Sequence, residues 1–211
     1  MTLNLRLKYS HFYYTKIPLN KTDLSFIQKW YHHEYSHFSE SRLEQFLAGR
    51  FCAIKAAAKF NFELLSLPMD HKRRPLWPKG ITGSISHTKN FAIAIVSNNA
   101  KSIGVDIESI IEAERWSKIK SKIITEDEQL IAEQKLFHPT LIFSAKETLY
   151  KLISPLADVF FDFLDAQLFT IEDNKFFIEL KSDKKELKSF NGIYEGYYIF
   201  FEDQIITYIE N

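Results

Sequence analysis

Residues 101–108 read KSIGVDIE, and their alternation predicts a β-strand. Successive side chains of a strand point to opposite faces, so the aliphatic residues at 103, 105 and 107 would share one face. Asp106 and Glu108 would then lie together on the other face. Carboxylates are ligands that magnesium prefers, so the pair indicates either a metal site or the solvent-facing side of a half-exposed strand.

A second stretch, FSAKETLYK at 143–151, lies inside a helical pattern that begins after Pro139. Proline is well suited to the first turn of a helix. Glu147 and Lys151 are four residues apart, so we expect them on one face of that helix. Taken alone, this spacing is also typical of an ion pair on a solvated surface.

Together the two stretches resemble the pattern of the 4′-phosphopantetheinyl transferases, (I/V)G(I/V)D followed after about forty residues by (F/W)SxKExxxK. The matching residues are Ile103, Gly104, Val105, Asp106, Phe143, Ser144, Lys146, Glu147 and Lys151. Several residue types coincide at fixed spacing, so the combination is far more specific than either stretch. Phe143 stands where many relatives have tryptophan, and either ring can pack.

The segment before the acidic strand extends the resemblance to the larger, monomeric, enterobactin-type class. In that class a helix with GRxxA precedes a loop RxPxWPxG and then GSISH. Here these motifs are Gly49, Arg50 and Ala53; Arg74, Pro75, Trp77, Pro78 and Gly80; and Gly83, Ser84, Ile85, Ser86 and His87. Arg73 and Arg74 replace a more acidic pair of several relatives. The resemblance covers about residues 42–151.

Composition excludes several other classes of protein. The 211 residues include 27 Lys and Arg and 27 Asp and Glu, so no global charge favours nucleic acid or an anionic membrane. The single cysteine, Cys52, excludes an internal disulfide, and its apolar neighbours predict a buried packing residue. Neither an apolar run of about 20 residues nor a signal-peptide pattern is present, so we expect a cytoplasmic protein.

The pattern along the chain predicts a mixed α+β fold. We expect an opening strand within 3–18 and helices over 24–35 and 41–60, the first of which would be entered through Thr22 or Asp23. An antiparallel meander should begin at residue 84 and end in the acidic strand. Thr125 and Glu128 are spaced as a capping box that opens a helix through Phe137. Further strands are expected over 159–169, 175–181 and 196–210, with a turn at Glu202 and Asp203. The resemblance implies two similar strand-and-helix subdomains, 1–103 and 104–211, related as a pseudo-dimer.

The resemblance also implies an activity. The phosphopantetheine arm of coenzyme A would be transferred to a serine of an apo acyl, peptidyl or aryl carrier protein, with release of adenosine 3′,5′-bisphosphate. Asp106, Glu108 and Glu147 would hold magnesium, or manganese in its place. Glu147 would act as general base, either directly or through a metal-bound water, and Asp106 and Lys151 would complete the catalytic set.

The expected coenzyme A ligands are basic or polar. They are Arg42, Arg50, Lys72, Ser86, His87, Lys146 and Lys151. Lys146 and Lys151 would neutralise the pyrophosphate, whereas Arg42, Arg50, Lys72 and His87 are candidates for the 3′-phosphate, since arginine grips phosphate with two donors. The alternative interpretation of Arg42 and Arg50 is a solvent-exposed basic edge of their helix.

Two other functions remain open at this point. One is a relative that binds coenzyme A or a carrier protein without turnover, and the other is a magnesium-dependent hydrolase of coenzyme A. We expect a monomer that binds neither nucleic acid nor membrane. His32, His33 and His37 invite a zinc site, but the pattern lacks cysteine or a paired acidic motif, so we interpret them as surface residues.

Overall fold

The computed structural model describes residues 3–31, 35, 38–133 and 138–211. Its contacts form two compact units. One comprises Leu5–Ile107 with Glu210–Asn211 and is called the N-terminal unit here; the other, the C-terminal unit, comprises Glu108–Ile209 with Met1–Asn4. The three histidines considered for zinc and the expected helix end at Phe137 lie outside the described residues.

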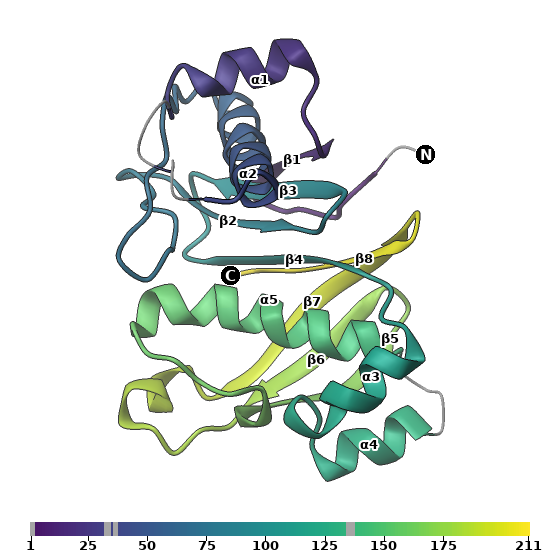
Figure 1. Ribbon diagram of the computed structural model, residues 1–211. Coiled ribbons are helices and arrows are strands. Elements are labelled where there is room, and N and C mark those ends of the chain that lie inside the picture. Colours follow the sequence, from purple (N-terminus) through teal and green to yellow (C-terminus); the bar gives the residue numbers. More distant parts are fainter. Residues whose placement is uncertain (1–2, 32–34, 36–37, 134–137) are drawn as a thin grey trace. The chain divides into compact units, whose positions relative to one another are not determined.

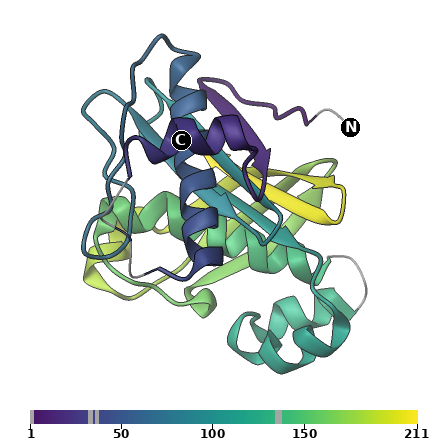
Figure 2. The same ribbon diagram turned by 45° about the horizontal axis from the view of Figure 1, so that its top comes forward.

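The N-terminal unit contains an antiparallel three-stranded sheet in the order β1-β3-β2. The strands are β1 (Ser10–Lys16), β2 (Thr82–His87) and β3 (Phe91–Ser97). The central strand β3 is buried along its whole length, and α2 (Glu40–Ala58) packs against all three strands (Figures 1 and 2). The predicted opening strand is confirmed only from Ser10 onward.

Helix α2 confirms the predicted long helix and explains the glycine of the GRxxA motif. Ser39 caps the helix, and its hydroxyl accepts a hydrogen bond from the amide of Arg42. A Cβ atom on Gly49 would lie 2.8 Å from the side chain of Ile85 in β2. The absence of that atom allows α2 to approach β2 closely, which brings residues of both elements to one place.

The helix expected over 24–35 is α1 (Lys21–Gln28). Entry through Thr22 or Asp23 is wrong, because the side chain of Asn20 accepts the amide of Asp23 at 3.0 Å and begins the helix earlier.

The predicted meander is also wrong in one respect. Strand β4 (Ile103–Ser109) is not a strand of the first sheet, because β1 and β2 occupy both edges of β3; β4 belongs to the second sheet instead.

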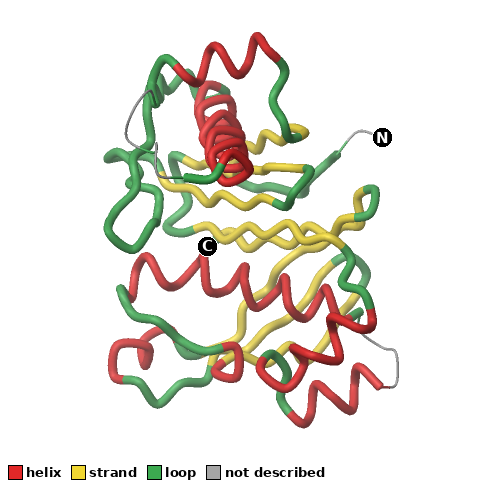
Figure 3. The backbone as a smooth tube through the Cα atoms, in the orientation of Figure 1, coloured by secondary structure: helices red, strands yellow, loops and turns green. Residues whose placement is uncertain are grey.

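The C-terminal unit combines a sheet with the long helix α5 (Pro139–Ala157). The strands β5 (Ala166–Glu172), β6 (Lys175–Leu180), β7 (Gly192–Phe201) and β8 (Gln204–Glu210) pair antiparallel in sequence order. Helix α5 lies along this sheet, as the tube in Figure 3 shows. Proline stands at its first turn, as the sequence predicts, and the turn at Glu202 and Asp203 is confirmed.

The strand expected over 159–169 begins only at Ala166. Residues Phe163–Asp165 form the 3-10 helix η2, and the side chain of Asp165 accepts the amide of Asp162, which closes this turn. The remaining helices are α3 (Ala113–Ile119), η1 (Lys120–Lys122), α4 (Glu126–Glu133) and η3 (Lys185–Phe190). No helix in the described part of the chain has the length and apolarity needed to span a membrane.

The mixed α and β architecture with two sheets is confirmed. Cys52 packs in the core of the N-terminal unit, and burial raises the pKa of its thiol. The resemblance implies subdomains that meet after residue 103, which stays a prediction, and the contacts divide the chain after Ile107. The internal repeat stays a prediction.

Candidate active site

A basic pocket of about 110 Å³ lies in the N-terminal unit, between α2, β2 and the loop that precedes β2. Four side chains with positive charge or hydrogen-bonding nitrogen converge on it: Arg42, Arg50, Arg73 and His87. Among the described residues that line the pocket, none is acidic. The pocket is therefore suited to an anion.

Arg50 is the most unusual member of this set. Its side chain is 5% exposed and its guanidinium lies 4.5 Å above the ring of Phe46. The Nε donates to the carbonyl of Leu67 at 2.7 Å, but the buried Nη2 has no hydrogen-bond partner among the described residues. Burial lowers the pKa of Arg50 to about 10. A buried donor without an acceptor is costly, so this guanidinium is prepared for an anionic ligand.

Arg42 and His87 are joined across the pocket. Arg42 Nη1 lies 2.6 Å from Nε2 of His87, and since arginine can only donate, this imidazole nitrogen accepts. Burial lowers the pKa of Arg42, and the neighbouring charge of Arg73 lowers it further. Both observations indicate excess positive charge that an anion would relieve.

The loop before β2 places Arg73 in the pocket. Asp70 organises this loop: its carboxylate accepts the amides of Lys72 and Arg74, each at 2.8 Å, and Nε of Arg74 at 2.7 Å. Arg73 adopts a positive φ of 63° within the turn. Arg73 was not among the coenzyme A ligands predicted from the sequence, although the basic run around it was a usable signal. Lys72 is exposed and is not among the residues that line the pocket.

The acidic strand β4 contributes Asp106, whose side chain is almost fully buried. The hydroxyl of Ser86 in β2 donates to Oδ1 of Asp106 at 2.8 Å. Ser84, two residues earlier, accepts the amide of Val105 at 3.1 Å. Strand β2 thus holds β4 through two serine hydroxyls. The structure places Ser86 against a carboxylate, so a direct contact with coenzyme A stays a prediction.

The three expected metal ligands belong to different parts of the structure. Asp106 is in the N-terminal unit, whereas Glu108 and Glu147 are in the C-terminal unit. Asp106 and Glu108 are two residues apart in one strand, so they share a face. Within the described ranges, no group of three His, Cys, Asp or Glu side chains is arranged to hold a metal ion. The donor chemistry suits magnesium, and the site stays a prediction.

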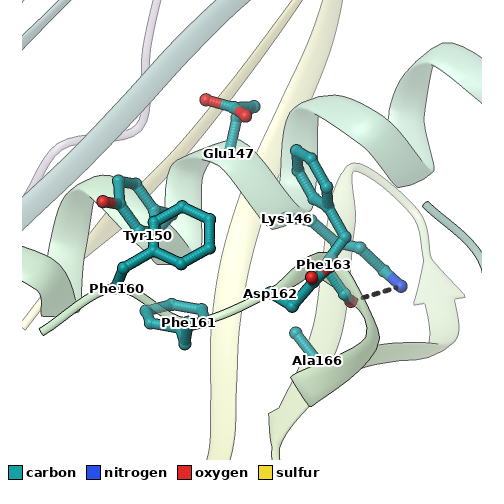
Figure 4. A pocket seen from close by; sticks show the side chains of 8 residues that line it. All are labelled: Lys146, Glu147, Tyr150, Phe160, Phe161, Asp162, Phe163 and Ala166. Atoms are coloured by element: carbon teal, nitrogen blue, oxygen red, sulfur yellow. Dashed lines mark hydrogen bonds between the residues drawn. The ribbon is translucent and has the colours of Figure 1, made fainter. Parts of the chain in front are cut away.

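A second pocket, of about 150 Å³, opens beside Glu147 in the C-terminal unit (Figure 4). Tyr150 of α5 forms one side, and the segment 160–163 forms an aromatic wall with Phe160, Phe161 and Phe163. The ring centroids of Tyr150 and Phe161 are 5.2 Å apart. This pocket was not predicted from the sequence, because the pattern places these phenylalanines in a strand over 159–169. Lys151 lies one turn beyond Glu147 on α5 and is half-buried.

The structure gives Lys146 different partners from those expected. Its ammonium is buried and donates to Glu128 Oε2 at 2.6 Å, to the carbonyl of Ile123 at 2.7 Å and to that of Phe163 at 3.0 Å. An ammonium has three donors, and these acceptors use all three. Burial lowers the pKa of Lys146, against the opposing charge of Glu128. These partners occupy the ammonium that was expected to neutralise the pyrophosphate.

Two family models match the chain over most of its length. The model described as the 4′-phosphopantetheinyl transferase N-terminal domain matches residues 32–97, and that of the 4′-phosphopantetheinyl transferase superfamily matches residues 102–209. The chain belongs to the 4′-phosphopantetheinyl transferase superfamily. The basic pocket lies within the first match, and Asp106, Glu108 and Glu147 lie within the second.

Relatives within the transferase superfamily carry informative names. Enterobactin synthase component D of Salmonella typhimurium is 37% identical over 59% of this chain and 53% of its own length, so the chain spans about half of that relative. The protein of the same name in Escherichia coli O157:H7 is 32% identical over 72% of this chain and 73% of its own length. The 4′-phosphopantetheinyl transferase Npt of Nocardia iowensis is 30% identical over 64% and 62% of the two chains.

Proposed function

We propose that this chain transfers the 4′-phosphopantetheine arm of coenzyme A to a serine of an apo carrier protein. The observation that carries the proposal is the basic pocket, where the buried Arg50 Nη2 has no partner in the part of the chain that the structure describes, together with membership of the transferase superfamily. Coenzyme A has a 3′-phosphate and a pyrophosphate, and therefore needs such anion sites. The names of the relatives point to the same activity.

The basic pocket would hold a phosphate group of coenzyme A. Its volume of about 110 Å³ suits a phosphate better than a whole nucleotide. Arg50 would donate from Nη2, and Arg42 and Arg73 would add charge. His87 would orient Arg42 through their contact of 2.6 Å. Lys72, at the surface of the same loop, would add long-range attraction.

The aromatic pocket beside Glu147 would receive the arm that is transferred. Pantetheine alternates methylene and dimethyl groups with amides, so an apolar wall with a few polar groups at its edge is a suitable environment. Tyr150 and Phe161 offer ring faces to the methylene groups, and Glu147 lies at the edge of the same pocket.

The proposed reaction is a displacement at the phosphorus that carries the arm. The serine Oγ of the carrier forms a bond to this phosphorus, the bond from phosphorus to the bridging oxygen breaks, and adenosine 3′,5′-bisphosphate leaves with the electron pair. Glu147 would take the serine proton, and Lys151 would offset the charge that develops on the phosphate oxygens. Asp106, Glu108 and Glu147 would hold magnesium, which, when bound, would neutralise phosphate oxygens.

The decisive test is intact-mass analysis of apo carrier proteins incubated with this protein, coenzyme A and magnesium. The panel should include siderophore, polyketide, peptide and fatty-acid carriers, since the names of the relatives point to a siderophore pathway. We expect a mass gain of one phosphopantetheine arm, loss of that gain with a chelator, and a matching release of adenosine 3′,5′-bisphosphate. Carriers with the acceptor serine replaced by alanine are the control.

Other results would favour the alternatives. Release of phosphopantetheine in the absence of any carrier would indicate a hydrolase, whereas coenzyme A binding without product would indicate a non-catalytic relative. We further propose that the enzyme works in the cytoplasm, because its composition shows neither disulfide pairs nor a charge bias toward membranes. We also propose that it is a monomer, like the class that its motifs resemble.

A further inference from the structure

A buried ion pair lies directly behind the pocket that contains Glu147. Lys146 is 1% exposed and Glu128 is fully buried, with 2.6 Å between Nζ and Oε2. Glu128 also accepts the amide of Thr125 through Oε2 at 2.8 Å, which completes the capping box predicted from the sequence, and the amide of Leu168 through Oε1 at 2.7 Å. The pair therefore connects α4, α5 and β5 at one point.

Lys146 extends the connection to the aromatic wall. Its ammonium donates to the carbonyl of Phe163 at 3.0 Å, and Lys146 and Phe163 both line the pocket (Figure 4). Lys146 and Glu147 are consecutive residues, and their side chains leave α5 in different directions in this view. Glu147 thus lies at the pocket edge while its neighbour fixes the wall from behind.

The wall has other attachments besides this hydrogen bond: the ammonium of the exposed Lys184 donates to the carbonyl of Phe160 at 3.2 Å, and Phe161 packs in the core of the C-terminal unit. Phe161 and Phe160 contact the ring of Tyr150, with centroids 5.2 and 5.6 Å apart, and Phe163 contacts Phe143 at 5.5 Å. Ring contacts of this kind tolerate sliding, whereas a charged donor on a backbone carbonyl sets distance and direction. The buried Lys146 therefore locates the Phe163 end of the segment 160–163, whereas the exposed Lys184 contacts its Phe160 end.

A buried ion pair is seldom the most stable choice for such a place. Desolvation of two charges offsets their attraction, and apolar residues of similar volume frequently stabilise as well or better. We infer that Glu128 and Lys146 form a positioning pair that holds the aromatic wall at a set distance from Glu147, so that the transferred arm is presented to the acceptor serine. This inference rests on the proposed transferase function.

The test uses a variant in which neither charge is left alone. Lys146→Met by itself would leave a buried carboxylate and risks unfolding, so Glu128→Gln is combined with it. The matched control is Glu114→Gln with Lys118→Met, which removes an exposed ion pair of the same 2.6 Å length from α3. Leu180→Ala, a buried residue of the second sheet, controls for a general loss of stability.

Two measurements separate positioning from mere stability. Hydrogen exchange of the amides in segment 160–168 should become faster in the buried double variant and stay unchanged in the surface control. At a temperature where all variants are folded, kcat for arm transfer should fall at least about tenfold, with Kd for coenzyme A within about twofold of the parent. Leu180→Ala should lower the unfolding temperature and keep kcat.

Each outcome decides the inference. Unchanged exchange in segment 160–168 would show that the pair does not locate the wall, and faster exchange with unchanged kcat would show that its position does not matter for transfer; either result overturns the inference. A proportional change of kcat in Leu180→Ala would reduce the effect to stability. If the parent protein itself transfers no arm to any carrier, the proposed function fails first and the inference fails with it.

Discussion

Ser86 Oγ donates a hydrogen bond of 2.8 Å to Oδ1 of Asp106, between a strand of the first sheet and the acidic strand β4. Both side chains are buried. The hydroxyl therefore orients a carboxylate that the family pattern assigns to metal binding. Ser86 would in this way support the proposed metal site, and its direct contact with coenzyme A stays a prediction.

Replacement of Ser86 by alanine should weaken magnesium binding. One carboxylate oxygen of Asp106 loses a donor, so we expect a severalfold higher magnesium requirement, and a stability loss of about 1–2 kcal/mol. Transfer assays across a magnesium titration would measure the first effect. Ser84→Ala is the control, since it loses the bond from the amide of Val105 without touching Asp106. An equal magnesium shift in both variants would contradict the assignment.

Arg50→Met should separate binding from stability. Loss of the buried guanidinium should weaken coenzyme A binding at least about tenfold, or 1.4 kcal/mol, by calorimetry. The unliganded variant should unfold at the same temperature as the parent or above it, because the parent buries a charge whose Nη2 finds no acceptor among the residues that the structure describes. Lys21→Met, an exposed residue of α1, is the charge-matched control. Strong binding by Arg50→Met would remove the pocket from the proposal.

The hydrogen bonds to the Asp70 carboxylate predict that the stability contributed by this residue depends on pH. Desolvation alone would raise the pKa of Asp70, but hydrogen bonds from Arg74 and Lys72 outweigh it and lower the pKa below 3.8. An acid with a lowered pKa stabilises the fold above its unfolded pKa and loses this effect as the pH falls through the folded pKa. The difference in unfolding temperature between the parent and Asp70→Asn should therefore be largest near pH 6 and shrink below pH 3.8.

Two further results would check the Asp70 argument. Asp70→Asn should also weaken coenzyme A binding, because the turn places Arg73 in the basic pocket. Asp173→Asn, in the turn between β5 and β6, should leave binding unchanged. A constant difference in unfolding temperature from pH 6 to pH 3 would refute the role of the carboxylate charge.

Glu147→Gln should abolish transfer and keep substrate binding. The amide cannot take the serine proton or bind a metal as a carboxylate does, so we expect kcat to fall by about two to four orders of magnitude. Coenzyme A binding, measured without magnesium, should stay within about twofold, because the phosphate pocket belongs to the N-terminal unit. Glu172→Gln, exposed at the end of β5, is the control. Retained turnover would remove Glu147 from the mechanism.

Thr207→Val tests how α5 is attached to β8. The buried hydroxyl of Thr207 lies 2.7 Å from that of Ser144 and 2.6 Å from that of Thr148, and it also contacts the carbonyl of Ser144 at 2.9 Å. Valine keeps the shape but leaves two buried hydroxyls short of a partner. We expect a loss on the order of 2 kcal/mol in urea unfolding. Thr170→Val, half-buried on β5, should change stability by less than about 0.5 kcal/mol.

Local pattern was enough for most of the elements. The long helix α2, the start of α5 at Pro139, the capping box of Glu128 and the last hairpin were all predicted, because period, proline position and cap spacing act within a few residues. The predicted element boundaries were wrong where another contact overrides the local pattern. The Asn20 cap makes α1 begin before the predicted residue, and the 3-10 helix at 163–165 makes β5 begin after the predicted residue.

The candidate site shows the same division. Motif spacing identified Arg42, Arg50 and His87, and the structure brings these residues together in one pocket. Adjacency in sequence gave no hint that Lys146 turns away from Glu147 to Glu128, or that Ser86 meets Asp106. Those partners are 18 and 20 residues away along the chain, so packing of separate elements selects them. Periodicity indicates which face a side chain takes, whereas burial and the acceptors available on that face determine its role.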